Sequence, residues 1–210
     1  MADHCTVPYK TAATLALAAG LSVSANAATL KVGDILPADT RFTDSAGAAH
    51  TFADYRGKPL VLEWTNPGCP FVRKFYDAKA MQQLQAETTA KGVSWLTVNS
   101  SAPGKEGHLS ADSAPAAVAK EGWNGTAYVL DGAHGSTLGK LLGAQTTPHM
   151  FVADAQGKLV YAGAIDSIPS FNAADISKAD NYVRLAADAV LAGKTPATSS
   201  TRPYGCSVKY

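Results

Sequence analysis

The sequence predicts an α/β fold, with a central mixed β-sheet flanked by helices on both faces and an N-terminal β-hairpin extension. Two observations lead to this prediction. Short apolar runs alternate with longer helical patterns, an order that is typical of parallel strands covered by helices. A hairpin and a final helix then close the pattern, and a hairpin adds antiparallel strands to the sheet. The 210 residues contain no internal repeat, so we expect one domain.

The predicted sheet begins after a short extended lead-in at residues 30–37. Residues 41–43 and 50–52 flank the turn-forming segment Asp44 to Gly47, which predicts a small hairpin. Residues 59–65 are almost continuously apolar and have the length of a strand that is buried on both faces. We expect the first central strand there.

A long helical pattern follows, from about residue 70 to residue 90, with apolar residues spaced by three and four and Gly92 at its end. The later elements are expected as strands at 93–98 and 127–130, helices at 115–121 and 138–142, a hairpin of 149–153 and 159–163, and an amphipathic helix at 180–192.

Composition excludes some classes of function. Lys and Arg number 18 against 17 Asp and Glu, a formal charge of +1, so neither nucleic acid nor an anionic membrane surface is an expected partner. The hydrophobic share of 46% and the charged share of 17% are those of an ordinary globular protein.

The N-terminal residues 1–27 have the pattern of a secretory signal peptide. A basic start ends at Lys10, an apolar stretch follows, and Ala25 and Ala27 suit cleavage before Ala28. We therefore expect a mature protein without stable membrane insertion, in a periplasm or secreted. It would comprise a domain at 28–194 and a flexible C-terminal tail at 195–210.

Cleavage changes the cysteine count. Cys5 leaves with the signal peptide, and only Cys69 and Cys206 remain in an oxidising compartment. These two permit a single intramolecular bridge.

Cys69 follows a buried strand and immediately precedes Pro70. Proline favours the first position of a helix, which makes Cys69 the residue that caps the helix start. Free backbone N–H groups, the helix dipole and the nearby cations Arg73 and Lys74 all favour its thiolate. A thiolate attacks disulfides and peroxides, so the position predicts a lowered pKa and a reactive sulfur.

These residues, with Thr147-Pro148 before the second hairpin, resemble the thioredoxin superfamily and its redoxin, peroxiredoxin-like branch. The resemblance covers about 29–194 and rests on residues 54–64, on Pro67-Gly68-Cys69-Pro70, and on residues 147–154 with Gly157. It implies a thioredoxin-like fold, Cys69 as the nucleophile, a cis proline at Pro148, and a substrate chain lying against Thr147. We expect Pro70, Thr147 and Pro148 to bind substrate, and we expect no cofactor.

The sequence departs from two familiar active sites of that superfamily. A dithiol site needs a second cysteine at position 72, which is Val72, and a peroxidase motif needs residues other than Leu62 and Asn66. Three functions therefore stay open: an exported thiol-disulfide oxidoreductase that uses Cys69, a peroxidase that reduces hydroperoxides, and a non-catalytic redoxin fold that binds a partner or senses redox state. The expected partners are a protein disulfide or hydroperoxide substrate and a thiol reductant that the sequence does not identify.

Roles for four further residues are open. Cys206 would resolve Cys69, form a static bridge with it, or be a free or intermolecular thiol. Arg73 would stabilise the thiolate, and the acidic Glu63 would either shuttle a proton or lie in a polar layer. His149 would hydrogen-bond the sulfur or simply pack. Arg73 occupies the position where a copper-delivery site needs its second cysteine, so we expect no metal site.

Overall fold

The computed structural model describes residues 1–2 and 29–210. All of the predicted signal peptide except its first two residues lies outside this part of the chain. Within the described part, no helix has the length and apolar character needed to cross a membrane. The predicted domain limits, 28–194 and 195–210, stay predictions.

A five-stranded mixed sheet forms the centre of the molecule, with strand order β5-β4-β3-β7-β8. Strand β3 pairs in parallel with β4 and antiparallel with β7, and every residue of β3 is buried. The predicted mixed sheet is therefore confirmed. Its strands are β3 (Leu60–Trp64), β4 (Ser94–Val98), β5 (Ala127–Val129), β7 (His149–Ala153) and β8 (Leu159–Gly163).

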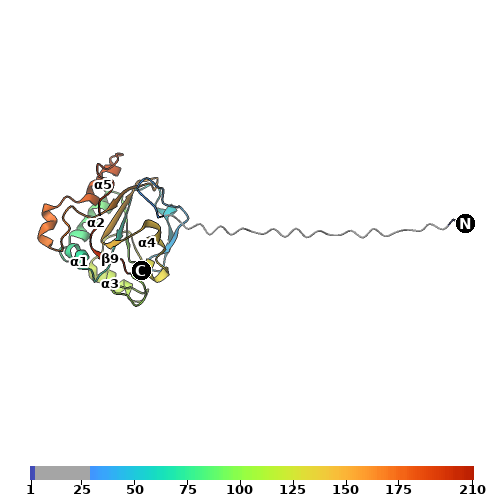
Figure 1. Ribbon diagram of the computed structural model, residues 1–210, viewed down its shortest axis with the longest axis horizontal. Helices are drawn as coiled ribbons and strands as arrows, with labels where there is room; N and C mark the ends of the chain where they lie inside the picture. The colour runs from blue at the N-terminus through green and yellow to red at the C-terminus, as the bar shows by residue number, and fades with distance from the viewer. Residues whose placement is uncertain (3–28) are drawn as a thin grey trace.

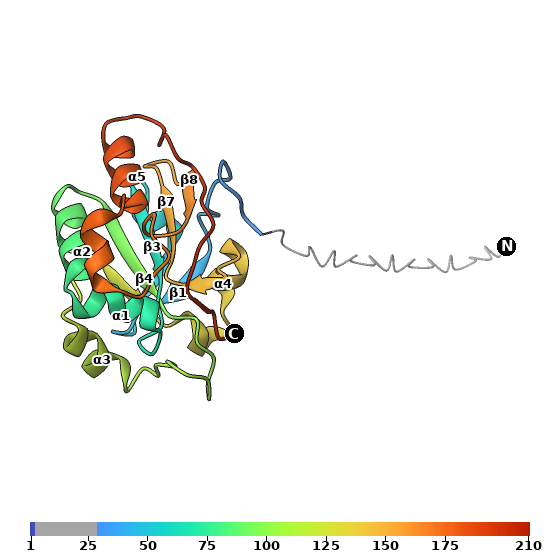
Figure 2. The ribbon, with the colours of Figure 1, turned by 60° about the vertical axis from the view of Figure 1, so that its left-hand side comes forward.

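Helices cover both faces of this sheet, as the sequence predicts (Figure 1, Figure 2). On one face lie α1, α2 and α5, and on the other lie α4 and the predicted N-terminal hairpin, while α3 lies near the β5 edge. The bounds are β1 (Arg41–Thr43), β2 (Ala49–Thr51), α1 (Pro70–Asp77), α2 (Ala80–Ala90), α3 (Ala114–Glu121), α4 (Thr137–Leu142) and α5 (Tyr182–Leu191). Short 3-10 helices are η1 (Phe52–Tyr55), η2 (Asp131–His134) and η3 (Ala173–Lys178).

The alternation of side chains along β3 divides the core in two. Val61 points toward α1, α2 and α5, whereas Leu60, Leu62 and Trp64 point toward α4 and the hairpin. Because both faces of β3 are apolar, the sheet is held between two layers, and the loop after β3 leaves it at a fixed point.

The prediction of one long helix at 70–90 is wrong. The chain forms α1 and α2, separated at Ala78 and Lys79, and Lys79 has a left-handed backbone with φ of 61°. The buried residues Val72 and Phe75 lie on a face that a straight helix would continue at 79 and 80, but the second helix instead buries Met81 and Leu84. The break turns this second apolar face back toward the sheet.

The C-terminal tail, residues 195–210, lies along the domain and contains a short strand that the sequence did not predict. After α5 the tail runs beside β8 and ends near α4 (Figure 2). Strand β9 (Cys206–Ser207) pairs antiparallel with β6 (Thr146–Thr147), the segment that precedes Pro148.

Candidate active site

Cys69 lies at the position that the sequence predicts, as the N-cap of α1 with Pro70 at the start of the helix. Asn66 shapes the turn before it, because its side-chain Oδ1 accepts a hydrogen bond from the Gly68 N–H at 2.8 Å and its carbonyl accepts one from the Cys69 N–H at 3.0 Å. The cysteine side chain points inward and is 2% exposed. Its sulfur is therefore held beyond the carboxyl end of the central strand β3, close to β6.

The Thr147-Pro148 peptide bond is cis, as the resemblance implies. The carbonyl oxygen of Thr147 lies 3.0 Å from the Sγ atom of Cys69 and accepts a hydrogen bond from it. The chain that lies against Thr147 in this structure is the protein's own tail, because Thr147 pairs with Cys206 in the β6–β9 ladder.

This pairing brings Cys206 directly to Cys69. The two Sγ atoms are 2.7 Å apart, although 137 positions separate the residues in the sequence. Both cysteines are free thiols, and a covalent S–S bond would be about 2.05 Å long. The structure therefore holds two reduced sulfurs in direct contact.

The two sulfurs differ in acidity. Burial alone would raise the pKa of Cys69, but hydrogen bonds with the Cys206 side chain and with the backbone N–H groups of Cys206 and Val72 more than offset it and lower that pKa below its ordinary value. Burial, together with the hydrogen bond and charge of Cys69, raises the pKa of Cys206 to about 12. Of the two thiols, Cys69 is therefore the one that loses its proton first as the pH rises.

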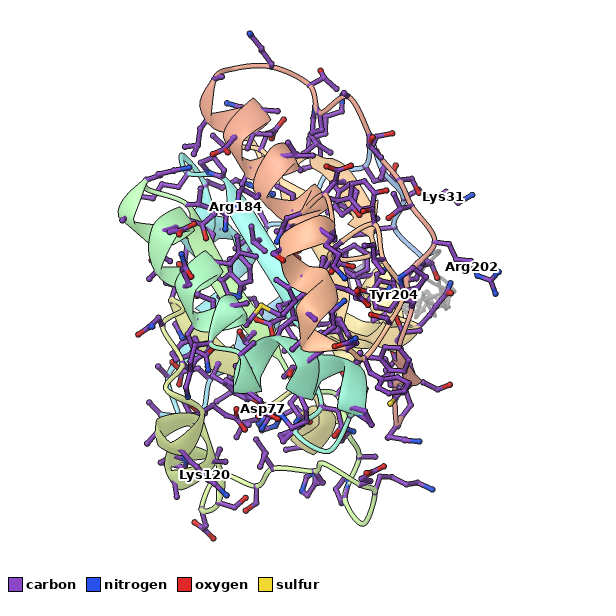
Figure 3. All side chains as sticks on the ribbon, turned by 90° about the vertical axis from the view of Figure 1, so that its left-hand side faces the viewer. Lys31, Asp77, Lys120, Arg184, Arg202 and Tyr204 are labelled. Atoms are coloured by element: carbon purple, nitrogen blue, oxygen red, sulfur yellow. The ribbon has the colours of Figure 1, made fainter. Side chains whose placement is uncertain are left out.

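A buried cluster, which we call the tail anchor, holds the chain next to Cys206. It consists of Lys74 on α1, Asp166 after β8, and Tyr204 in the tail. The Nζ atom of Lys74 lies 3.1 Å from Oδ2 of Asp166, and the Tyr204 hydroxyl donates a hydrogen bond to the other carboxylate oxygen. The side chains of Lys74 and Asp166 are 0% and 3% exposed. Figure 3 labels Tyr204 on the tail, where the neighbouring Arg202 extends into solvent.

Sequence reasoning missed the tail anchor. The signal present in the sequence is a lysine between the apolar residues Val72 and Phe75 on the buried side of a helix, and a tyrosine two positions before a cysteine. Neither pattern identifies its partner, because Asp166 lies 92 positions from Lys74.

Arg73 and Pro70 lie near Cys69 in sequence, but the structure shows no contact between Arg73 and the sulfur. The Arg73 guanidinium forms two hydrogen bonds to Glu121, at 2.7 and 2.5 Å, and its Cζ lies 5.4 Å from the ring centre of Tyr76. Pro70 is exposed and borders an open hollow that also includes Gly68 and Phe171. The roles of Arg73 in thiolate stabilisation and of Pro70 in substrate binding remain predictions.

Glu63 is fully buried on the α1–α2 face of the sheet, in a polar layer. Its carboxylate accepts hydrogen bonds from the side chains of Tyr76, Gln85, Trp95 and Thr97, at 2.8 to 3.0 Å. Burial raises the pKa of Glu63, and these donors offset part of that effect. Neither cysteine is among its hydrogen-bond partners, so the geometry matches the polar-layer alternative.

His149 faces the opposite core from Cys69 and packs there. Its ring lies 4.4 Å from that of Phe151, and its Nδ1 accepts a hydrogen bond from the Gln145 N–H at 3.2 Å. Burial lowers the pKa of His149 to about 4. Among residues 1–2 and 29–210, no three His, Cys, Asp or Glu side chains converge in a way that would hold a metal ion.

The sheet order, the helices on both faces, and a helix-capping cysteine beside a cis proline define a thioredoxin-fold protein. A family model described as Redoxin matches residues 31–183. The chain therefore belongs to the redoxin family.

Three solved structures show the same fold. A hypothetical protein of Sinorhizobium meliloti 1021 is 25% identical, with a TM-score of 0.70 over 87% of this chain and 96% of that one. An uncharacterized conserved protein of Geobacillus kaustophilus is 24% identical, with a TM-score of 0.69 over 86% and 92%. A protein of Chlorobium tepidum, named as a thiol:disulfide interchange protein DsbE, is 23% identical, with a TM-score of 0.51 over 64% and 85%. No curated protein matches the chain.

Proposed function

We propose that this redoxin is a thiol oxidoreductase that cycles between the Cys69 and Cys206 dithiol and an intramolecular disulfide. The observation that carries the proposal is the 2.7 Å contact between the two sulfurs. Closing the disulfide releases two electrons and two protons, which an oxidant must accept. An external disulfide takes them up as two thiols, and a hydroperoxide takes them up as an alcohol and water.

Cys69 is the attacking sulfur in this proposal because its pKa is the lower of the two. Its thiolate attacks one sulfur of a disulfide, expels the other as a thiolate, and becomes a mixed disulfide. With a hydroperoxide, it becomes a sulfenic acid and releases the alcohol. Cys206 then attacks Cys69, expels the second thiol or water, and completes the disulfide. An external thiol reductant returns the pair to the dithiol.

The site of action is proposed to lie outside the cytoplasm. The pattern of residues 1–27 supports export, and a disulfide persists in an oxidising compartment. The mass and N-terminal sequence of the protein recovered from a periplasmic fraction test this step, with a start at Ala28 as the expected result.

The test of the redox pair uses the reduced protein and its Cys206→Ser and Cys69→Ser variants. Each is treated with a small disulfide and, separately, with hydrogen peroxide, and the products are mapped by peptide mass spectrometry. We expect the wild type to form the Cys69–Cys206 disulfide and Cys206→Ser to stop at a mixed disulfide or sulfenic acid on Cys69. Cys69→Ser should react at least about tenfold more slowly, because burial by itself still raises the pKa of the remaining thiol, Cys206.

The relative rates with the two oxidants distinguish the two activities. A faster reaction with the disulfide indicates disulfide exchange, and a faster reaction with hydrogen peroxide indicates peroxidase activity. Equal reactivity of Cys69→Ser and wild type would remove Cys69 as the nucleophile. Failure of any thiol reductant to restore the dithiol would favour the non-catalytic alternative, a binding or redox-sensing protein.

A further inference from the structure

The tail occupies the strand edge that lies beside the nucleophile. Thr147 pairs with Cys206, Thr146 pairs with Ser207, and the Val208 N–H donates to the Gln145 carbonyl at 3.0 Å. An extended polypeptide that approached Cys69 along this edge would need the same backbone groups. The hydrogen-bonding edge of β6 is therefore already occupied by the protein's own tail.

The tail also approaches the Thr147-Pro148 peptide more closely than any side chain would allow. Gly205 has a φ of 139°, and a Cβ atom built on it would lie 2.1 Å from the Thr147 carbonyl oxygen. No segment of a second polypeptide fits between the tail and Thr147 while Gly205 is in this place.

The tail is fastened on both sides of Cys206. Before it, Tyr204 belongs to the tail anchor and its ring packs edge-on against Phe71, with centres 5.8 Å apart. After it, the Lys209 carbonyl accepts a hydrogen bond from the Ala102 N–H at 2.8 Å, and the Tyr210 hydroxyl donates one to the Ala144 carbonyl at 2.7 Å. Releasing the tail thus breaks contacts at both ends together.

We infer that the seated tail reserves Cys69 for oxidants of low molecular weight and excludes polypeptide disulfides from it. This inference rests on the proposed function and names its class of substrate. Cys69 is 2% exposed beneath the tail, so only a compact molecule reaches the sulfur without displacing β9. In the step itself, the Cys69 thiolate attacks one sulfur of a small disulfide and releases a thiolate. Cys206 then closes the intramolecular disulfide and releases the second thiol.

The test compares two oxidants that share one chemistry and differ in size: hydroxyethyl disulfide and the polypeptide disulfides of insulin. The readout is the rate at which the Cys69 thiol disappears, followed by quenching, alkylation and mass spectrometry, because this rate does not require Cys206 to react. The ratio of the insulin rate to the small-disulfide rate is compared between variants.

Gly205→Ala displaces the tail through the collision with Thr147, and Tyr204→Phe removes only the hydrogen bond to Asp166. Gly193→Ala is the matched control, because Gly193 also has a positive φ of 70° but no atom lies within 4 Å of the position that a Cβ atom would take there. We expect the ratio to rise about tenfold or more in Gly205→Ala, because the state in which the tail has left β6 changes from a minor to a major population. The rise should be smaller in Tyr204→Phe and absent in Gly193→Ala.

An unchanged ratio in both Gly205→Ala and Tyr204→Phe would overturn the inference while leaving the proposed redox pair intact. The inference would also fail if the ratio of the insulin rate to the small-disulfide rate were the same in the wild type as in Gly205→Ala. If Gly205→Ala does not fold, Tyr204→Phe against wild type decides the result. If the Cys69 thiol instead reacts with neither oxidant, the proposed function itself is contradicted.

Discussion

The acidity of Cys69 depends on its neighbours more than on its own burial. The sulfur is almost fully covered, which opposes ionisation, yet the hydrogen bonds around it reverse the effect. The largest of these favourable contributions comes from Cys206, a residue of the tail. The sequence predicts Cys69 at the helix start correctly but gives no sign of Cys206 as its neighbour, and the predicted contribution of Arg73, whose guanidinium is paired with Glu121, stays a prediction.

We therefore predict that the pKa of Cys69 rises in Cys206→Ala and rises less in Cys206→Ser, because a serine hydroxyl still donates a hydrogen bond. The ultraviolet absorbance of the thiolate, followed against pH in the reduced protein, measures this pKa. Cys69→Ser provides the blank. Identical pKa values for wild type and Cys206→Ala would show that the tail does not contribute to the acidity of Cys69.

At the scale of the elements, the position of β9 depends on a buried ion pair that belongs to neither β6 nor β9. Lys74 comes from α1 and Asp166 from the segment after β8, and together they receive Tyr204 of the tail. A buried charge that loses its partner is costly, whereas an exposed pair contributes little. The tail anchor should therefore matter to stability far more than the pairs on the surface.

We predict that Asp166→Ala lowers the free energy of unfolding by about 3 to 5 kcal/mol, because it leaves the ammonium group of Lys74 buried and unpaired. Tyr204→Phe should cost about 1 to 3 kcal/mol, the range for a hydrogen bond to a charged group. The control is Asp188→Ala, whose partner Lys91 lies 2.7 Å away with side chains about half exposed, and which should cost less than about 1 kcal/mol. Denaturant unfolding measures all three. Equal losses for Asp166→Ala and Asp188→Ala would contradict the role of the tail anchor.

At the scale of the whole molecule, His149 links stability to pH. It lies in the core formed with Phe151, and burial lowers its pKa to about 4 against an ordinary value of about 6.5. The unfolded chain binds a proton at His149 as the pH falls below 6.5, whereas the folded chain does not until about pH 4. Acidification through this window therefore favours unfolding.

We predict that His149→Gln removes a loss of stability of about 3 kcal/mol that the wild type undergoes between about pH 6.5 and pH 4. The comparison of denaturant midpoints for the two proteins across this range isolates the histidine from the carboxyl groups that titrate in both. His134→Gln, which alters an exposed histidine, is the control and should follow the wild type. Parallel pH profiles for wild type and His149→Gln would contradict this prediction, because they would show that His149 has the same pKa in the folded and the unfolded chain.

The sequence by itself determined the elements of the sheet and the start of α1. An apolar run such as residues 60–64 and a Cys-Pro pair after a turn are local signals, and local backbone preferences and burial act on them directly. The same periodicity did not reveal the break at Lys79, because apolar residues on two successive helices still fall at spacings of three and four.

Only the tertiary structure decided which thiol meets Cys69. The tail carries no periodic pattern, and its place is set by contacts with residues far away in the chain: Thr147 through backbone pairing, and Lys74 and Asp166 through a buried ion pair. The same holds for the salt bridge between Arg73 and Glu121 and for the polar layer around Glu63. Such pairings depend on how the sheet and helices pack, and no local propensity encodes a contact between residues 137 positions apart.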